Sequence, residues 1–166
     1  MKTLHLVAFV LIAVAVLFAG CGKSDEMKKV EAGLNTEVMQ KHDDMMKAMS
    51  SLDATAEQIT TTIAKHDSLV KLFPKQLAGH DATDLLAAKE KLESAKGAMT
   101  AWMKGFKPYD PKAKHEVVME SLKKTKDDLV VVERQFQEAL TTAKDAMASH
   151  AQVMDELIAK MPMKKK

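Results

Sequence analysis

Hydrophobic residues recur at alternating intervals of four and three along three segments of the chain, from Val38 to Phe73, from Leu85 to Phe106 and from His115 to Leu157. An average interval of 3.5 residues keeps one side of an α-helix facing a partner helix, whereas a strand would alternate every second residue. The pattern therefore predicts three long helices that pack through continuous apolar stripes.

Residues that interrupt helices stand between the three segments. Pro74 ends the first segment, because the residue before a proline is pushed out of helical geometry. Asp81 or Thr83 is the candidate N-cap for the second segment. Gly105 is predicted to adopt a left-handed conformation just after that helix. Asp110 and Pro111 form a pair typical of an N-cap and a first helical residue.

These signals predict helices at about 36–73, 81–104 and 111–160. Short connections make consecutive helices antiparallel, so the fold class is an all-α, antiparallel, coiled-coil-like bundle of three unequal helices spanning 36–160. Residues 21–35 are interpreted either as a tether or as a continuation of the first helix after a stutter.

Unequal lengths make a further prediction about the ends of the bundle. The first helix should overhang one end of the second by roughly 14 residues, and the third should overhang the opposite end by roughly 26. Both overhangs keep an apolar stripe, which favours self-association or a bound partner. A break of the third helix near Thr141 and Thr142 is the alternative.

The first 20 residues have the layout of a secretory signal peptide. Lys2 gives a positive start, residues 6–19 are apolar, and the only cysteine of the chain follows at Cys21. The end of this segment resembles a bacterial lipobox, in which the cysteine is acylated. Ordinary signal-peptidase cleavage and retention as a membrane helix are the alternatives, but the first lacks an A-x-A pattern and the second lacks length. Cys21 is therefore the predicted lipid attachment site.

Charge and motifs argue against several classes of function. The chain has 25 basic and 23 acidic residues, and Arg134 is its single arginine, so a nucleic-acid-binding role is not expected. The sequence shows no G-x-S-x-G, H-E-x-x-H, C-x-x-C or P-loop spacing. We therefore expect no catalysis, no cofactor and no small-molecule substrate.

Four histidines fall on the stripes and look at first like a ligand set: His42, His66, His115 and His150. The predicted overhangs place His42 and His150 at opposite ends, with His66 and His115 also far apart. No two of them should then come within metal-binding distance of each other. We interpret them as structural residues.

Methionines close to the histidines suggest metal binding as the main alternative to a purely structural role. His42, Met45, Met46 and Met49 stand at i, i+3, i+4 and i+7, and His150 and Met154 repeat the spacing at i, i+4. Thioethers beside an imidazole are suitable ligands for Cu(I), so sequestration of this metal is a competing hypothesis. If copper is not bound, these methionines simply fill the core.

The basic tail, residues 161–166, ends in three lysines. A lipid-anchored helical protein with a terminal lysine resembles the murein lipoprotein of enteric bacteria, whose last lysine is joined to peptidoglycan. This architectural similarity implies tethering to the cell wall as a further alternative.

Two stretches carry a family resemblance: Val38-Met39-x-x-His42-Asp43-Asp44-Met45-Met46-x-x-Met49, and Ala101-Trp102-Met103-x-x-Phe106. Together with residues 122–129, they are similar to small helical lipoproteins of Bacteroidota, often labelled viral A-type inclusion proteins, over about 36–140. The resemblance implies a lipid-anchored envelope protein with a helical bundle, and it implies no activity. Residues 21–26 also look like the lysine-plus-acid signal that sends such lipoproteins to the cell surface.

The sequence thus predicts an envelope protein that is lipid-anchored to the outer membrane, facing either the periplasm or the exterior. We expect it to act by contact, through self-association or a helical protein partner.

Overall fold

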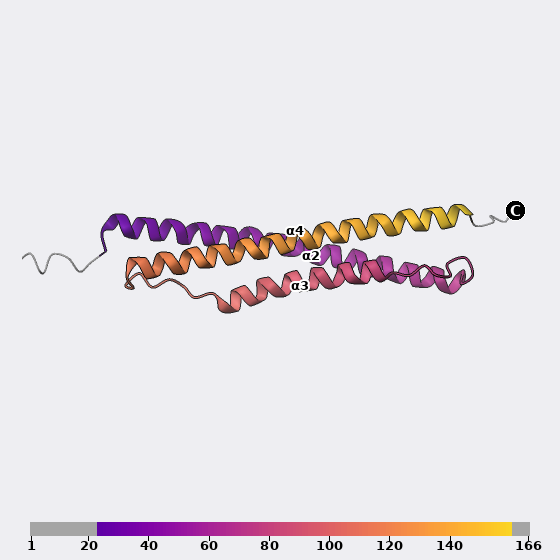
Figure 1. Ribbon diagram of the computed structural model, residues 1–166, viewed down its shortest axis with the longest axis horizontal. Coiled ribbons are helices and arrows are strands. Elements are labelled where there is room, and N and C mark those ends of the chain that lie inside the picture. Colours follow the sequence, from indigo (N-terminus) through magenta and orange to yellow (C-terminus); the bar gives the residue numbers. More distant parts are fainter. Residues whose placement is uncertain (1–22, 161–166) are drawn as a thin grey trace, which may run out of the picture.

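The computed structural model describes residues 23–160, which form three helices: α2 (Asp25–Leu72), α3 (Thr83–Gly105) and α4 (His115–Lys160). Each helix packs against the other two, and no strand occurs between residues 23 and 160. The all-α three-helix bundle predicted from the stripes is therefore confirmed. The molecule is long and narrow, and α3 lies beside only part of the other two helices (Figure 1).

Helices α2 and α4 run parallel, and α3 runs antiparallel to both (Figure 1). Near the start of both long helices, His115 Nδ1 lies 2.9 Å from Glu31 Oε1. Toward their ends, the rings of His66 and His150 lie 5.0 Å apart, centre to centre. Both pairs are separated by 84 residues, so α2 and α4 keep one register along the bundle.

The prediction of overhangs at opposite ends was wrong. After α3, residues 106–114 do not turn back at once but continue toward the start of α2, so α4 begins beside that start (Figure 1). Nine residues can span up to about 30 Å when extended, and prolines at 108 and 111 prevent helix formation there. The parts of α2 and α4 that extend beyond α3 therefore lie at the same end and cover each other.

Helix α2 begins earlier than predicted, and residues 25–35 are helical. The Ser24 hydroxyl accepts a hydrogen bond from the backbone N–H of Met27 (3.2 Å), and Asp25 and Glu26 occupy the first turn. This is an N-cap with acidic residues where the helix dipole favours them. The expected stutter is absent, because Met27 and Val30 are exposed while Glu31, seven residues before Val38, is buried.

Helix α4 begins four residues later than predicted. Asp110 does not cap it; its carboxylate accepts the backbone N–H of Lys112 (2.8 Å) and its carbonyl accepts that of Ala113 (3.0 Å), which closes a turn instead. Gly105 ends α3 without the predicted left-handed conformation, since among residues 23–160 only Gly79 has a positive φ, of 84°. Helix α4 then continues through residues 141 and 142 without the alternative break.

The second helix begins two residues later than predicted. Asp81 lies outside α3, but its carboxylate still accepts the backbone N–H of Thr83, the first residue of the helix (3.0 Å). Asp81 therefore accepts a hydrogen bond from the first residue of α3, although Asp81 itself lies two residues before the helix.

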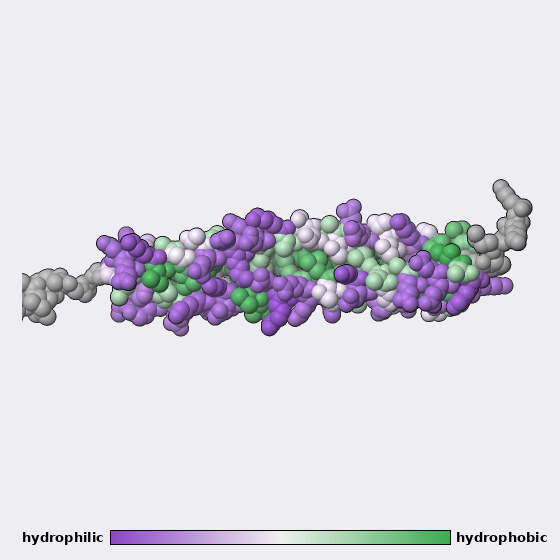
Figure 2. Space-filling model, turned by 90° about the horizontal axis from the view of Figure 1, so that it is seen from above, coloured by the Kyte–Doolittle hydropathy of each residue, from purple (hydrophilic) through white to green (hydrophobic). Residues whose placement is uncertain are grey.

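The apolar stripes form the core, as predicted. The buried cluster consists of Val38, Met45, Leu52, Ala56, Ile59, Ala82, Leu85, Ala88, Leu92, Ala95, Met99, Leu129, Val132, Phe136, Ala139 and Ala143. The outer surface is largely hydrophilic, with apolar patches between the charged side chains (Figure 2). Within residues 23–160, no helix combines the length and the apolar character needed to span a bilayer.

Candidate functional sites at the two ends of the bundle

The predicted lipid attachment site, Cys21, lies outside the described residues, as do the predicted signal peptide (1–20) and the basic tail (161–166). The structure therefore describes the chain from Lys23 onward, two residues after the cysteine.

A buried polar cluster joins the starts of α2 and α4. Glu31 is 1% exposed, and Lys23 Nζ lies 2.7 Å from Glu31 Oε1 and donates to Oε2 at 2.8 Å. His115 Nδ1 lies 2.9 Å from the Oε1 atom of the same carboxylate. The hydrogen bond from Lys23 is the largest influence on the pKa of Glu31 and lowers it; burial opposes this shift and the bond from His115 reinforces it. The cluster fixes Lys23, the first described residue, to the body of the bundle.

Sequence reasoning missed Glu31, although a signal was present. Glu31 stands seven residues before Val38, which makes it a member of the first stripe. A charged residue at an apolar position of a heptad is rarely buried unless it is paired. Lys23 and His115 are the partners that make its burial tolerable.

An aromatic stack lies where α3 ends. The ring of Trp102 stacks on Phe106, with centroids 5.2 Å apart, and on His42 of α2, at 5.6 Å. The indole N–H of Trp102 donates to the carbonyl of Thr125 on α4 (3.3 Å). The stack therefore connects all three helices and has a structural role.

This stack also separates the side chains of the first candidate copper face. His42 packs on Trp102 and its Nδ1 lies 3.0 Å from an Asp43 oxygen. Met45 is 4% exposed and part of the core, whereas Met46 is 39% exposed and faces solvent. Met49, the third methionine of the face, packs against the core cluster that contains Met45. Met46 is thus separated from the other two thioethers by its exposure, and the geometry does not favour copper binding at this face.

The prediction that no two stripe histidines meet was wrong. His66 on α2 and His150 on α4 are in edge-to-face contact, with ring centres 5.0 Å apart and an interplanar angle of 62°. The error follows from the wrong overhangs, because parallel α2 and α4 bring the ends of both helices together. His66 is buried, and its Nδ1 atom has no hydrogen-bond partner among the described residues.

A small cavity adjoins this histidine pair. It has a volume of about 210 Å³ and is lined by His66, Gly79, His80, Asp81, Ala82, Asp84, Leu85, Ala146, Ser149, His150, Val153 and Met154. No group of three His, Cys, Asp or Glu side chains within residues 23–160 has the geometry of a metal site. Two imidazoles and the thioether of Met154 are nevertheless close to one hollow.

The histidine pair should make stability depend on pH. Burial, with a smaller contribution from the charge of His66, lowers the pKa of His150 from its usual 6.5. As the pH decreases, the unfolded chain therefore takes up a proton at His150 before the folded chain does. The contribution of His150 to the free energy of unfolding is fully present above about pH 6.5 and is lost as the pH decreases below it. We expect the urea midpoint of unfolding to decrease between pH 7.5 and pH 5.5, and His150→Gln to remove most of this decrease.

His80→Gln is the matched control for that titration. His80 lines the same cavity but is exposed, so its replacement should leave the pH profile unchanged. An unaltered decrease in His150→Gln would show that another group causes the pH dependence.

A larger groove lies between α2 and α4. Its volume is about 420 Å³, and its lining includes the apolar residues Met45, Ala48, Phe136 and Leu140. Polar residues share the lining, and among them Lys41 Nζ forms an ion pair with Glu133 Oε2 at 2.6 Å. An apolar floor with charged edges is the kind of surface that accepts an amphipathic helix.

Comparison with known proteins gives no relative for this chain. No family model matches it, and neither a curated protein nor a solved structure does.

Proposed function

We propose that this protein is a lipid-anchored helical rod of the cell envelope, held in the outer membrane by acylated Cys21 and acting by contact with a protein partner or a second copy of itself. The role requires no catalysis. The resemblance to small helical lipoproteins of Bacteroidota agrees with this proposal.

The observation that carries the proposal is the position of the bundle relative to the cysteine. Helix α2 starts at Asp25, four residues after Cys21, and Lys23 pairs with the buried Glu31. An acylated cysteine at position 21 would therefore connect to the bundle through a very short segment. The 48 residues of α2 give the rod a length of about 72 Å. A rod mounted in this way would hold its sides away from the membrane surface.

The groove between α2 and α4 is the best candidate contact surface. It combines the apolar side chains of Phe136 and Leu140 with the ion pair of Lys41 and Glu133 at its edge. Phe136 is already buried at the floor of the groove, so a partner helix with an apolar face could cover the partly buried Leu140, and the charged edge would favour one orientation. Attachment through the terminal lysine concerns residues 161–166, and no described residue bears on it.

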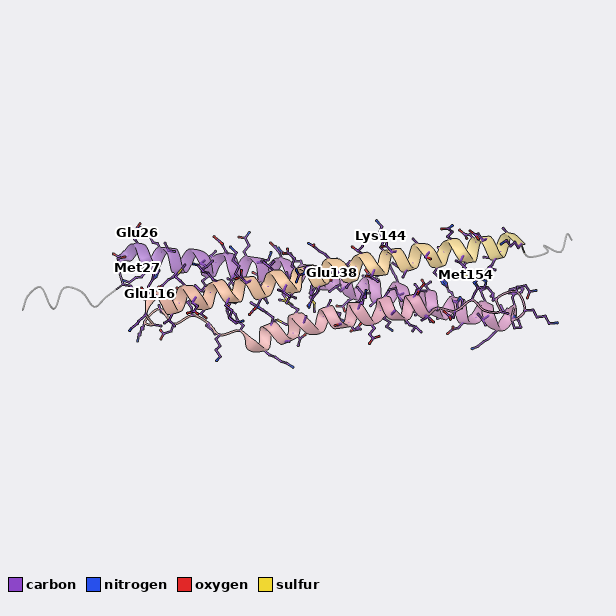
Figure 3. The ribbon with its side chains drawn as sticks, viewed as in Figure 1. Glu26, Met27, Glu116, Glu138, Lys144 and Met154 are labelled. Atoms are coloured by element: carbon purple, nitrogen blue, oxygen red, sulfur yellow. The ribbon has the colours of Figure 1, made fainter. Side chains whose placement is uncertain are left out.

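Site-specific photo-crosslinking tests the contact role. Gln137 and its neighbour Glu138 are both exposed, but only Gln137 lines the groove. Glu138 lies midway along α4 (Figure 3). We expect a benzophenone side chain at position 137 to form a discrete crosslinked species in intact cells, because a bound helix would cover it. The same group at position 138 should form little of that species.

The mass of the species identifies the occupant as either a second copy or another protein. Equal crosslinking at both positions, or none at position 137, would contradict a contact role for this groove.

A further inference from the structure

The cavity beside His66 and His150 lies where the ends of α2 and α4 meet the connection between α2 and α3. Met154 is seen on α4 near this end of the bundle, on the side toward the other helices (Figure 3). The cavity is therefore lined by three separate segments of the chain, at the opposite end of the bundle from Glu31 and His115.

The first unusual feature is an unpaired nitrogen. His66 is 4% exposed, and its buried Nδ1 has no hydrogen-bond partner in the described part of the chain. Buried polar atoms almost always have a partner, and leaving one without is unfavourable. An atom of this kind that adjoins a cavity is a candidate ligand for something that occupies the cavity.

The second feature is a neighbouring imidazole. His150 lies in direct contact with His66, with ring centres 5.0 Å apart and an interplanar angle of 62°, and both residues line the cavity. An imidazole nitrogen is a common metal ligand. The charged and titratable neighbours are His80, Asp81 and Asp84, and the Asp81 carboxylate already accepts the backbone N–H of Thr83 at 3.0 Å.

The third feature is a buried thioether. Met154 stands one helical turn after His150, which places both on the same side of α4. It is 9% exposed and lines the same cavity. Two imidazoles and one thioether form a small donor set without a thiolate, and the Asp84 carboxylate also lines the cavity.

We propose that His66, His150 and Met154 form a binding site for Cu(I). This monovalent ion favours soft ligands and tolerates low coordination numbers, whereas Zn²⁺ is almost always held by four donors in structural sites. The site is independent of the contact role proposed above. Two of its residues, His150 and Met154, stand at i and i+4 on α4, as the sequence shows. The third, His66, comes from α2.

Titration of the full chain with Cu(I) alone tests this proposal. The protein is purified in detergent under reducing conditions, and the thiol of Cys21 is alkylated wherever it is free, because it is the single cysteine and would itself bind copper. We expect one Cu(I) per chain in competition with a chromophoric chelator such as bicinchoninate. X-ray absorption should show nitrogen and sulfur neighbours of the metal.

Three variants locate the site. Met154→Leu keeps the apolar volume and removes the thioether, so the bundle should stay folded while affinity decreases by about tenfold or more. His150→Ala should abolish binding in competition. His42→Ala removes the imidazole of the other methionine-rich face and should leave binding unchanged.

Four outcomes would overturn the proposal. The first is the absence of Cu(I) binding by a folded chain, verified as helical by circular dichroism. The second is binding that survives in both Met154→Leu and His150→Ala, and the third is binding that is lost in His42→Ala. The fourth is equally tight binding of Zn²⁺, which would refute the assignment to a soft monovalent ion.

Discussion

In a chain whose residues 1–20 are exchanged for an ordinary cleavable signal peptide, replacing Cys21 with serine should move the protein from the membrane fraction to the soluble fraction of the cell and abolish its labelling by an alkyne analogue of palmitate. Each buried methylene of an acyl chain contributes ~0.8 kcal/mol to membrane association, so two or more chains hold a protein almost permanently. Within residues 23–160 no helix could cross the bilayer in their place. The measurement is fractionation with in-gel fluorescence of the clicked label.

A displaced cysteine provides the control. In the double variant Cys21→Ser, Ser24→Cys, a thiol is present but three residues from its original position, so labelling should not return. Ser24 also caps α2, and this variant therefore needs a check of helix content. Labelling or membrane association that persists without Cys21 would contradict the lipid anchor.

Leu85→Ala should lower the free energy of unfolding by about 2–5 kcal/mol, the range for removal of a fully buried leucine side chain. Leu85 is 0% exposed and belongs to the core cluster contributed by all three helices. The neighbouring helices cannot move in to fill the space left by the leucine side chain, because each is fixed by the packing of its own apolar stripe. Urea unfolding of the chain without residues 1–21, followed by circular dichroism, measures the change.

The next residue of α3 provides a matched control. Leu86 is 55% exposed, so Leu86→Ala should change the free energy of unfolding by no more than about 0.5 kcal/mol. Similar losses in both variants would mean that α3 does not pack through the face that contains Leu85.

The heptad stripes were sufficient to predict the helices and their core. Leu52, Leu92 and Leu129 come from three different stripes, and each is fully buried. A period of 3.5 residues determines which side of a helix is apolar, and this depends only on local spacing. That is why the fold class could be derived from the sequence.

The register between helices could not be derived in the same way. Pro108 and Pro111 show where the chain is not helical, but they do not show in which direction residues 106–114 run. A tight turn and an extended connection between α3 and α4 are both marked by the same local residues, such as proline. Which of the two forms depends on how the apolar stripes of the long helices pack against each other. The tight-turn interpretation placed the two overhangs at opposite ends and separated His66 from His150.

The polar end clusters depend on this register. Glu31 and His115, like His66 and His150, are 84 residues apart and meet only because α2 and α4 are parallel. Each of these residues lies on a stripe, so a search for stripe positions with one constant separation would have found both pairs. The sequence shows the positions, while the partners require the three-dimensional arrangement.

The most direct test of the account is a pair of distances between spin labels, measured by pulsed electron paramagnetic resonance in a chain with Cys21 replaced by serine. Glu26 and Glu116 lie at one end of the bundle, and Lys144 lies further along α4 (Figure 3). Parallel helices in the observed register separate labels at 26 and 116 by only about 9 Å along the axis, and labels at 26 and 144 by about 51 Å. A separation of about 35 Å or more between 26 and 116 would instead indicate helices that overhang opposite ends, and would contradict the parallel pairing of α2 and α4.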